Sequence, residues 1–416
     1  MSTTFLGDLA AYREDRERRA AVELAGRVLP FSQAEYRERH QRLREAMSAA
    51  GVDLVLLSRP ESMCWLTGYA ARWYRHGGPP EWPALTTTAV RADDDRIVHF
   101  DYPGEETLSA LTSVCDDVRT YPGETLDECL SFLRKELGSM GWLAGMVGRE
   151  RHSAVPDQAV ANSMDDALRT WGSRVCDASD LVSRLRHVKS AAEIACVEEA
   201  VRICDVGLRA AGETMAPGVT ELEVWAEMIR AMTAAGGEPA ALHEMVSGSP
   251  LLLYHGISSR RKLKEGDTVI VDPCGVVNRY HGNVSRCFYL GTPPPGLVEL
   301  LRLGGEGYGV FCEAAGDGVE VDRVGAVIES YFRDAGIWNL EWFCGGYELG
   351  IAFPPDWVGP WTFDFARRQP GKVFAAGMVT NLEMIFEMPL VDTVVYGPDG
   401  ARTLSSLPPA VIPVDV

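Results

Sequence analysis

The sequence predicts an α/β (α+β) protein with two domains, and three features support this prediction. Its 416 residues exceed the length of one ordinary domain. Over the first 180 residues or so, short apolar runs alternate with helical patterns, which is typical of an α/β domain. After residue 185, a long amphipathic helix opens a region where helices and strands come in separate runs. We therefore expect domains at 1–184 and 185–416.

The first domain is expected to begin its regular structure with a helix over 32–50. Ser32 followed by Glu35 is the sequence signature of a capping box, and apolar residues follow at helical spacing. The run 52–57 is apolar enough to be a buried strand. The remaining expected elements are a hairpin at 89–100 that turns around 92–95, a helix at 125–137 and a strand at 142–147.

The second domain is expected to open with a helix over Ser190–Ala211, because its apolar residues fall on one stripe. Thr220 then caps a second helix that runs to Ala234. Two similar halves, each of two helices followed by strands, would fit this order of elements. The other expected elements are strands at 244–247, 268–273 and 284–290, helices at 296–315 and 321–335, and short strands up to the C-terminus.

Composition limits the classes of partner and the compartment. Forty Lys and Arg against 59 Asp and Glu give a net charge of −19, which argues against nucleic acid or an anionic membrane as a partner. No apolar run approaches the roughly 20 residues of a membrane span, and the N-terminus lacks a signal-peptide pattern. The ten Cys include no CxxC pair, so we expect reduced thiols. The expected location is the cytoplasm.

Six segments of the second domain, in order along the chain, resemble one family. They are LRHVKSAAEI (185–194), APGVTELEV (216–224), HGISSRRKLKEGDTVIVDPCG (255–275), YHGNVSRCFYLG (280–291), GGYELGIAFPPDW (345–357) and AAGMVTNLEMIFEMP (375–389). The resemblance is to the creatinase/aminopeptidase P superfamily with the pita-bread fold. It implies a creatinase-type N-terminal domain followed by a C-terminal pita-bread domain.

Most members of this superfamily hold two metal ions with two Asp, one His and two Glu. Carried onto this sequence, the ligand positions are Asp272, Asn283, Tyr347, Glu383 and Val391, and a shift of one residue offers Asp392 for the last. Only Asp272 and Glu383 keep the residue type of the family. The eight His of the chain all lie at or before residue 281, so none is available for the His position. We therefore expect no metal and no other cofactor.

The resemblance places the chemistry on His255, which stands where the superfamily has a His that shuttles protons or contacts substrate. Without a metal, water activation requires a general base with a pKa near the working pH, and His suits this role. We predict that His255 is the proton shuttle and Glu383 its carboxylate partner. Asp272, Asn283 and Tyr347 are then expected to bind substrate. Arg286 is expected to pair with a carboxylate, and Cys274 and Cys287 to be buried and inert.

The first domain contributes one candidate segment, the Gly-, Pro- and aromatic-rich run at 68–82. In creatinase-like dimers, the corresponding loop reaches the active site of the partner subunit and contacts the substrate carboxylate. By this resemblance Tyr74, Arg75 and His76 are candidate substrate-binding residues, and the protein is expected to be a homodimer. The alternative is an ordinary surface loop with aromatic anchors.

These expectations combine into a functional hypothesis: a metal-independent hydrolase that cleaves a C–N bond of a small amidine, guanidino or cyclic-amide zwitterion. The segment GYELGIAFPPDW resembles the ectoine-hydrolase branch, whereas Glu383 is the creatinase-like choice. One alternative is a metallohydrolase like Xaa-Pro aminopeptidase or prolidase, or a one-metal lyase, with unorthodox ligands. Another alternative is a non-catalytic pita-bread protein that binds a ligand.

Overall fold

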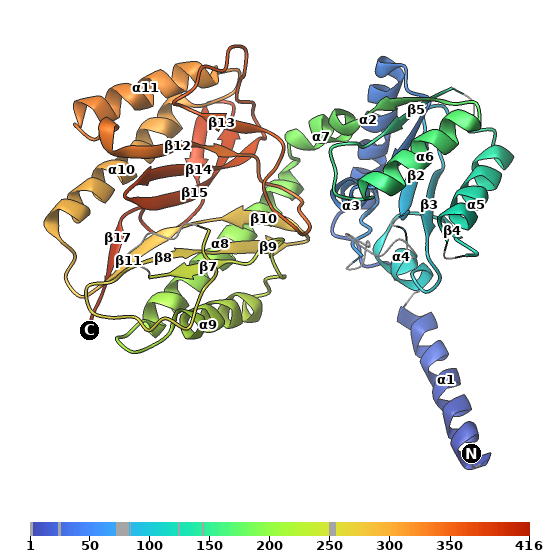
Figure 1. Cartoon of the computed structure of the whole chain (residues 1–416), viewed down its shortest axis with the longest axis horizontal. Coiled ribbons are helices and arrows are strands. Elements are labelled where there is room, and N and C mark those ends of the chain that lie inside the picture. Colours follow the sequence, from blue (N-terminus) through green and yellow to red (C-terminus); the bar gives the residue numbers. More distant parts are fainter. Residues whose placement is uncertain are drawn as a thin grey trace. The chain divides into compact units, whose positions relative to one another are not determined.

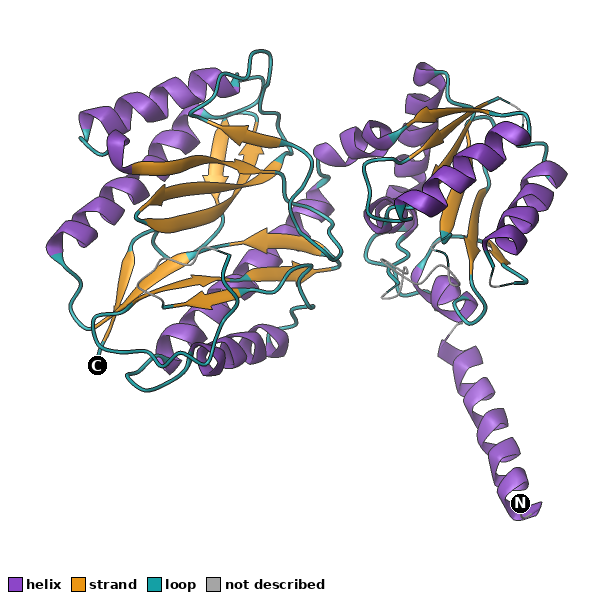
Figure 2. Cartoon of the chain, viewed as in Figure 1, coloured by secondary structure: helices purple, strands orange, loops and turns teal. Residues whose placement is uncertain are grey.

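The computed structural model has two compact units, Met1–Leu185 and Arg186–Val416. It describes residues 3–23, 26–71, 83, 85–123, 125–143, 145–248 and 255–416. Both units combine helices with strands, which confirms the predicted α/β class (Figure 2). Within the described ranges, no helix has the length and apolar character needed to cross a bilayer.

The first unit is built around a six-stranded sheet in the order β4-β3-β2-β1-β5-β6 (Figure 1). β2 pairs antiparallel with β1 and β3, which confirms the expected hairpin, and β5 lies parallel to β1 and β6. The strands are β1 (Leu54–Leu57), β2 (Thr87–Arg91), β3 (Ile97–Asp101), β4 (Asp117–Thr120), β5 (Met146–Arg149) and β6 (Arg174–Asp177).

The helices of this unit begin where the sequence supplies caps. Ser32 accepts a hydrogen bond of 3.2 Å from the backbone N–H of Glu35 at the start of α2, as predicted. Leu130, Leu133 and Leu137 of α5 pack into the core cluster formed with the sheet. The helices are α1 (Thr3–Glu23), α2 (Gln33–Ala50), α3 (Pro60–Thr67), α4 (Glu106–Thr112), α5 (Leu126–Ser139), α6 (Gln158–Thr170) and α7 (Ser179–His187).

The second unit contains two sheets and a hairpin, with helix pairs on either side of the strands (Figure 1). The four-stranded sheet has the order β17-β11-β8-β7, and the five-stranded sheet has the order β13-β12-β14-β15-β16. The strands are β7 (Met245–Ser247), β8 (Thr268–Asp272), β9 (Cys274–Val277), β10 (Tyr280–Asn283), β11 (Arg286–Leu290), β12 (Glu341–Tyr347), β13 (Thr362–Asp364), β14 (Val379–Phe386), β15 (Met388–Gly397), β16 (Gly400–Thr403) and β17 (Val411–Val414).

Each half of this unit opens with a pair of helices, as the expected duplication requires. Capping boxes at Ser190 and Thr220 start the first pair, and both sites were predicted as helix starts. The helices are α8 (Ala191–Thr214), α9 (Glu221–Ala234), α10 (Pro295–Ala314) and α11 (Val321–Asp334), with the short 3-10 helix η1 (Trp338–Leu340) after the last.

The hairpin of β9 and β10 packs closely against α8 because two glycines face each other across it. Gly275 pairs with Gly282, and a Cβ atom at Gly275 would lie 1.9 Å from the carbonyl oxygen of Ala200 on α8. Asn278 and Arg279 at the turn have φ values of 51° and 65°, as a two-residue turn of this handedness requires. The close contact fixes the end of β10, where Asn283 lies.

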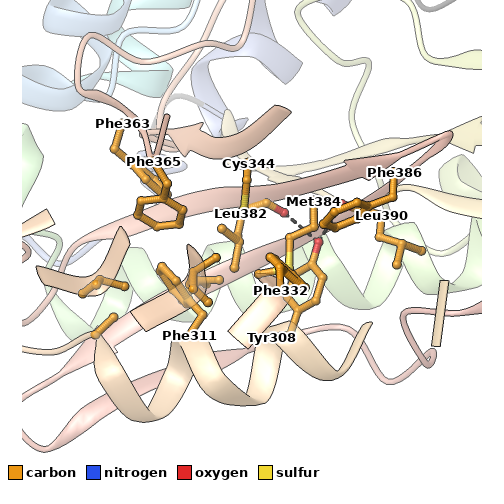
Figure 3. Packing of buried hydrophobic residues seen from close by; sticks show 14 of the residues in the cluster. Tyr308, Phe311, Phe332, Cys344, Phe363, Phe365, Leu382, Met384, Phe386 and Leu390 are labelled. Atoms are coloured by element: carbon orange, nitrogen blue, oxygen red, sulfur yellow. Dashed lines mark hydrogen bonds between the residues drawn. The ribbon is translucent and has the colours of Figure 1, made fainter. Parts of the chain in front are cut away.

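Alternate side chains of β14 point to opposite faces of the sheet, one of which is buried in the core. Leu382, Met384 and Phe386 point into an aromatic-rich core cluster under α10 and α11 (Figure 3). The hydroxyl of Tyr308 on α10 lies 2.9 and 2.6 Å from the carbonyl oxygens of Leu382 and Leu390, which share its single hydrogen, so it is satisfied within this core (Figure 3). The intervening residues of β14 therefore face away from the core.

Candidate functional site

The four polar residues predicted to surround the site come from four different strands. Asp272 ends β8, Asn283 ends β10, and Tyr347 ends β12. Glu383 lies within β14, opposite Gly345 of β12. The segments that carry these residues are far apart in the sequence and belong to three separate sheets: β8 to the four-stranded sheet, β10 to the hairpin, and β12 and β14 to the five-stranded sheet.

Amide side chains connect the two carboxyl groups of this site. Asn283 Nδ2 donates to Asp272 Oδ1 at 2.9 Å. Asn381 Nδ2 donates to Glu383 Oε1 at 2.7 Å and lies 3.4 Å from Asn283 Oδ1. A continuous path of hydrogen bonds thus runs from Asp272 through both amides to Glu383, and we call these four residues the amide–carboxyl network.

Asn381 and Trp357 hold Tyr347 in place. The backbone N–H of Tyr347 donates to Asn381 Oδ1 at 2.8 Å, and Trp357 Nε1 donates to the Tyr347 hydroxyl at 3.1 Å. The sequence did not reveal Asn381 as a site residue. The signal available for it was its position two residues before Glu383 on a strand, since residues i and i+2 share a face.

The environment tunes the acidity of both carboxyl groups. Burial raises the pKa of Asp272 to about 6, although the hydrogen bond from Asn283 acts in the opposite direction. Burial also raises the pKa of Glu383 to about 7, and the charge of Asp272 adds to this effect. Hydrogen bonds from Asn381 and Tyr347 partly offset the rise at Glu383. Near neutral pH, Glu383 therefore exists in both protonation states, as a general acid or base must.

Tyr347 remains a hydrogen-bond donor at all ordinary pH values. Burial and the charges of Glu383 and Asp272 raise the pKa of its hydroxyl well above the usual value. Its proton can therefore be directed to a carboxylate or to a substrate oxygen, while its own oxygen accepts from Trp357.

The structure distinguishes between Val391 and Asp392, the two residues considered for the position of the last family ligand. Val391 of β15 pairs directly with Glu383, so these two side chains share a face. The neighbouring Asp392 instead binds Arg286 Nη2 at 2.8 Å, and both side chains are almost fully buried. Arg286 therefore braces a carboxylate, as expected, and Asp392 is not a residue of the site.

His255 is not joined to its predicted partner. It is exposed, with a left-handed φ of 62°, and directly follows the undescribed residues 249–254. Among the described residues, no hydrogen bond or ion pair connects it to Glu383, which binds Asn381 instead. Its role as a proton shuttle therefore remains a prediction. The other nearby His, His281, is fully buried, and burial lowers its pKa to about 3, which keeps it neutral.

The remaining predicted residues are those at 74–76 and the cysteines. Tyr74, Arg75 and His76 lie outside the described residues, so their predicted contact with substrate is untested. All ten Cys lie in the described ranges and are free, and Cys274 and Cys287 are fully buried as expected. Burial raises the pKa of both of these thiols, which makes them poor nucleophiles.

Both units of the chain match known families. Residues 195–403 match metallopeptidase family M24, and residues 39–188 match the Creatinase/Prolidase N-terminal domain. The chain belongs to family M24. This membership confirms the predicted creatinase/aminopeptidase P superfamily and the order of its two domains.

Relatives of this M24 chain are named as hydrolases and peptidases. The ectoine hydrolase of Halomonas elongata is 27% identical over 361 residues, which cover 79% of this chain and 84% of that protein. The Xaa-Pro dipeptidase of Pyrococcus furiosus is 26% identical over 233 residues, which cover 54% of this chain and 65% of that protein. Both enzyme types are therefore found among the sequence relatives.

Solved structures share the fold of the M24 chain. The X-Pro aminopeptidase of Thermotoga maritima has a TM-score of 0.75 at 17% identity and covers 90% of this chain and 99% of its own. The dipeptidase PepE of Mycobacterium ulcerans has a TM-score of 0.72 at 22% identity and covers 94% of this chain and all of its own. These likenesses establish the pita-bread architecture.

The side chains at the metal positions of this M24 chain do not fit a metal pair. Asp272 and Glu383, the two residues that match the family's carboxyl ligands by resemblance, each accept a hydrogen bond from an amide nitrogen whose hydrogens would oppose a cation. Asn283, Tyr347 and Val391 stand at the other three positions of that resemblance. In the described ranges, no group of three or more His, Cys, Asp or Glu is placed to hold a metal ion.

Proposed function

We propose that this protein is a metal-independent hydrolase that cleaves a C–N bond of a small zwitterion carrying an amidine, guanidino or cyclic-amide group. The observation that carries the proposal is the amide–carboxyl network, in which Asp272, Asn283 and Glu383 stand at positions that the resemblance assigns to metal ligands. Similarity to the ectoine hydrolase of Halomonas elongata supports a substrate of this class. No step of the proposed reaction needs a metal.

The proposed reaction is the addition of water to the carbon of the C–N bond. His255 or Glu383 takes one proton from the water as its oxygen attacks the carbon. The electron pair of the C–N bond then passes to the nitrogen, which receives that proton. Tyr347 donates a hydrogen bond to the charge that develops on the substrate. The pKa of about 7 for Glu383 suits both halves of this transfer.

The test compares three kinds of substrate with the purified full-length chain. Ectoine, a guanidino acid such as creatine, and an Xaa-Pro dipeptide are incubated with and without a chelator, and products are identified by mass spectrometry. We expect hydrolysis of an amidine or guanidino compound that the chelator does not change, and its loss in Glu383→Gln. Dipeptide cleavage that requires added Mn²⁺ or Co²⁺ would contradict the proposal.

A peptidase is the second candidate, because the Xaa-Pro dipeptidase of Pyrococcus furiosus is among the sequence relatives. The substrate comparison separates it from the first candidate through the dipeptide and the metal requirement. Binding of small amidines without any product would instead indicate a non-catalytic binding protein.

We also propose that the active form is a homodimer in the cytoplasm in which the segment around Arg75 completes the site of the partner. Light scattering after size-exclusion chromatography measures the mass of the assembly. In a mixture of inactive Glu383→Gln and inactive Arg75→Ala subunits, a shared site would restore part of the activity. A monomer, or no recovery on mixing, would contradict this arrangement.

A further inference from the structure

Glu221 is a buried carboxylate that the proposed reaction does not use. It is the first residue of α9 and is only 3% exposed. Its Oε1 accepts a hydrogen bond of 2.9 Å from the backbone N–H of Gly248. Its Oε2 accepts from the backbone N–H and the hydroxyl of Ser259 at 3.0 and 2.6 Å. A single side chain thus binds two points of the chain that are distant from each other in the sequence.

The two points that Glu221 binds lie on either side of His255. Gly248 directly follows β7, and Ser259 comes shortly after His255. His255 has a left-handed φ of 62°. Residues other than glycine adopt this conformation rarely and keep it only where the surrounding structure imposes it. The contacts of Glu221 restrain the chain on both sides of this residue.

The restrained chain is also fixed to the sheet that carries Asp272. β7 pairs with β8, and Met245 of β7 lies opposite Asp272 at the end of β8. The hydroxyl oxygen of Ser258 accepts a hydrogen bond of 2.9 Å from the backbone N–H of Val246 on β7. The chain after His255 is therefore tied to the strand next to Asp272, which belongs to the amide–carboxyl network.

Glu221 differs from the other acidic residue in the first turn of α9. Acidic residues at this position commonly cap a helix, and the exposed Glu223 does so by accepting from the backbone N–H and the hydroxyl of Thr220 at 2.8 and 2.7 Å. Glu221 instead binds donors outside its own helix. Its role requires both carboxylate oxygens, because the NH₂ group of an amide would face one of these donors with hydrogens of its own.

We propose that Glu221 is a positioning residue that orders His255 for proton transfer by holding the chain on both sides of it. The inference rests on the proposed function, because it names the support of the residue predicted to move the proton. A displacement of about 1 Å at a reacting group can cost about 100-fold in rate, so such support matters for turnover. Glu221 lies outside the ligand positions of the family resemblance.

The first test needs no substrate. Ring signals of ¹³C-labelled His are recorded by NMR for the full-length chain, and the signal lost in His255→Ala identifies His255. We expect Glu221→Gln to shift or broaden this signal and to leave that of the buried His281 unchanged, whereas Glu223→Gln should match wild type. An unchanged His255 signal, or an equal change at His281, would overturn the inference. Should Glu221→Gln fail to fold, Ser259→Ala removes one donor to Glu221 and should move the His255 signal in the same way.

The second test is a double-mutant cycle on the hydrolysis of ectoine or creatine, whichever the chain cleaves. Glu221→Gln should lower kcat by about 10- to 100-fold with little change in KM. Because Glu221 acts through His255, Glu221→Gln should cause no further loss in the His255→Ala background. Losses that multiply in the double variant would overturn the inference and leave the proposed function standing. Absence of hydrolysis of both compounds would count against the proposed function alone, because the His255 signal decides the inference without substrate.

Discussion

Asn381 Nδ2 lies 2.7 Å from Glu383 Oε1, so the carboxyl group of Glu383 is held by an amide two residues earlier on the same strand. The other end of this amide accepts the backbone N–H of Tyr347 at 2.8 Å. Asn381 is fully buried and cannot exchange these partners for water. A single side chain therefore links the carboxyl group of Glu383 to the backbone of Tyr347.

Replacing Asn381 should raise the pKa of Glu383 further. Asn381→Ala removes a hydrogen bond that lowers this pKa, whereas Asn381→Asp adds a negative charge beside it. We expect upward shifts of about 1 unit for Ala and more for Asp, because nearby like charge opposes ionisation. NMR titration of ¹³C-labelled carboxyl groups measures the shift without requiring activity. An unchanged pKa in both variants would show that the amide does not control Glu383.

The raised pKa of Glu383 predicts how stability depends on pH. Its folded-state pKa of about 7 exceeds the ordinary value of 4.5, so the group favours the folded state while it is protonated. This contribution is fully present below about pH 4.5 and is lost as the pH rises through 7. Glu383→Gln cannot ionise. Between about pH 5 and 8, it should therefore gain about 1–3 kcal/mol of unfolding free energy relative to wild type.

Urea unfolding at several pH values measures this difference. Glu265→Gln removes an exposed carboxylate and serves as the matched control, with no comparable trend expected. A stability difference between Glu383→Gln and wild type that stays constant with pH would refute the assignment of a raised pKa.

The buried pair of Arg286 and Asp392 predicts a large loss of stability when it is broken. Arg286→Met leaves the Asp392 carboxylate almost fully buried without its cation. This should cost about 3–5 kcal/mol of unfolding free energy, whereas Arg286→Met combined with Asp392→Leu should recover much of the loss. Urea denaturation of both variants measures the two values. A single variant as stable as wild type would show that the pair contributes little.

Helices with a clear N-cap and a regular apolar spacing could be predicted from the sequence. Ser190 and Thr220 have the predicted role of starting helices, and the long stripe of α8 is buried against the hairpin of β9 and β10. The strand expected at 142–147 was misplaced, because β5 begins only at Met146. Trp142 lies in the connection between α5 and β5, where its side chain is buried in the core. From the sequence alone, a buried apolar residue in a connection cannot be distinguished from one in a strand.

Some residues of the candidate site could likewise be predicted from the sequence, and others could not. Asp272 and Glu383 were found because they match family motifs, whereas Asn381 belongs to no such motif and is connected to the site only through its place two residues before Glu383 on β14. The sequence could not decide between Val391 and Asp392. Neighbouring residues of a strand point to opposite faces, so the choice depends on the register of the strand, which the sequence does not give. The pairing of Glu383 with Val391 resolved it.

Replacing His255 should reduce activity without affecting the fold. His255→Ala should reduce turnover at least 100-fold, because proton transfer by a side chain contributes about that much or more. The exposed position of His255 means that folding should be unaffected. His243→Ala, also exposed and close in the sequence, is the control and should keep full activity. Full activity of His255→Ala would assign the proton transfer to Glu383 alone.

Introducing the residues that the resemblance gives for the family's metal ligands should create a metal site. Asn283→Asp, Tyr347→His and Val391→Glu together replace an amide, a phenol and an isopropyl group by donors around Asp272 and Glu383, and Val391 already shares a face with Glu383. Because oxygen-rich sites of this composition suit Mn²⁺, we expect the triple variant to bind it, with a rise in melting temperature that the parent chain lacks. Val391→Gln in place of Val391→Glu is the control, since it fills the same space without the charge. Equal stabilisation of parent and triple variant by Mn²⁺ would show that the amide–carboxyl network accepts a metal as it stands.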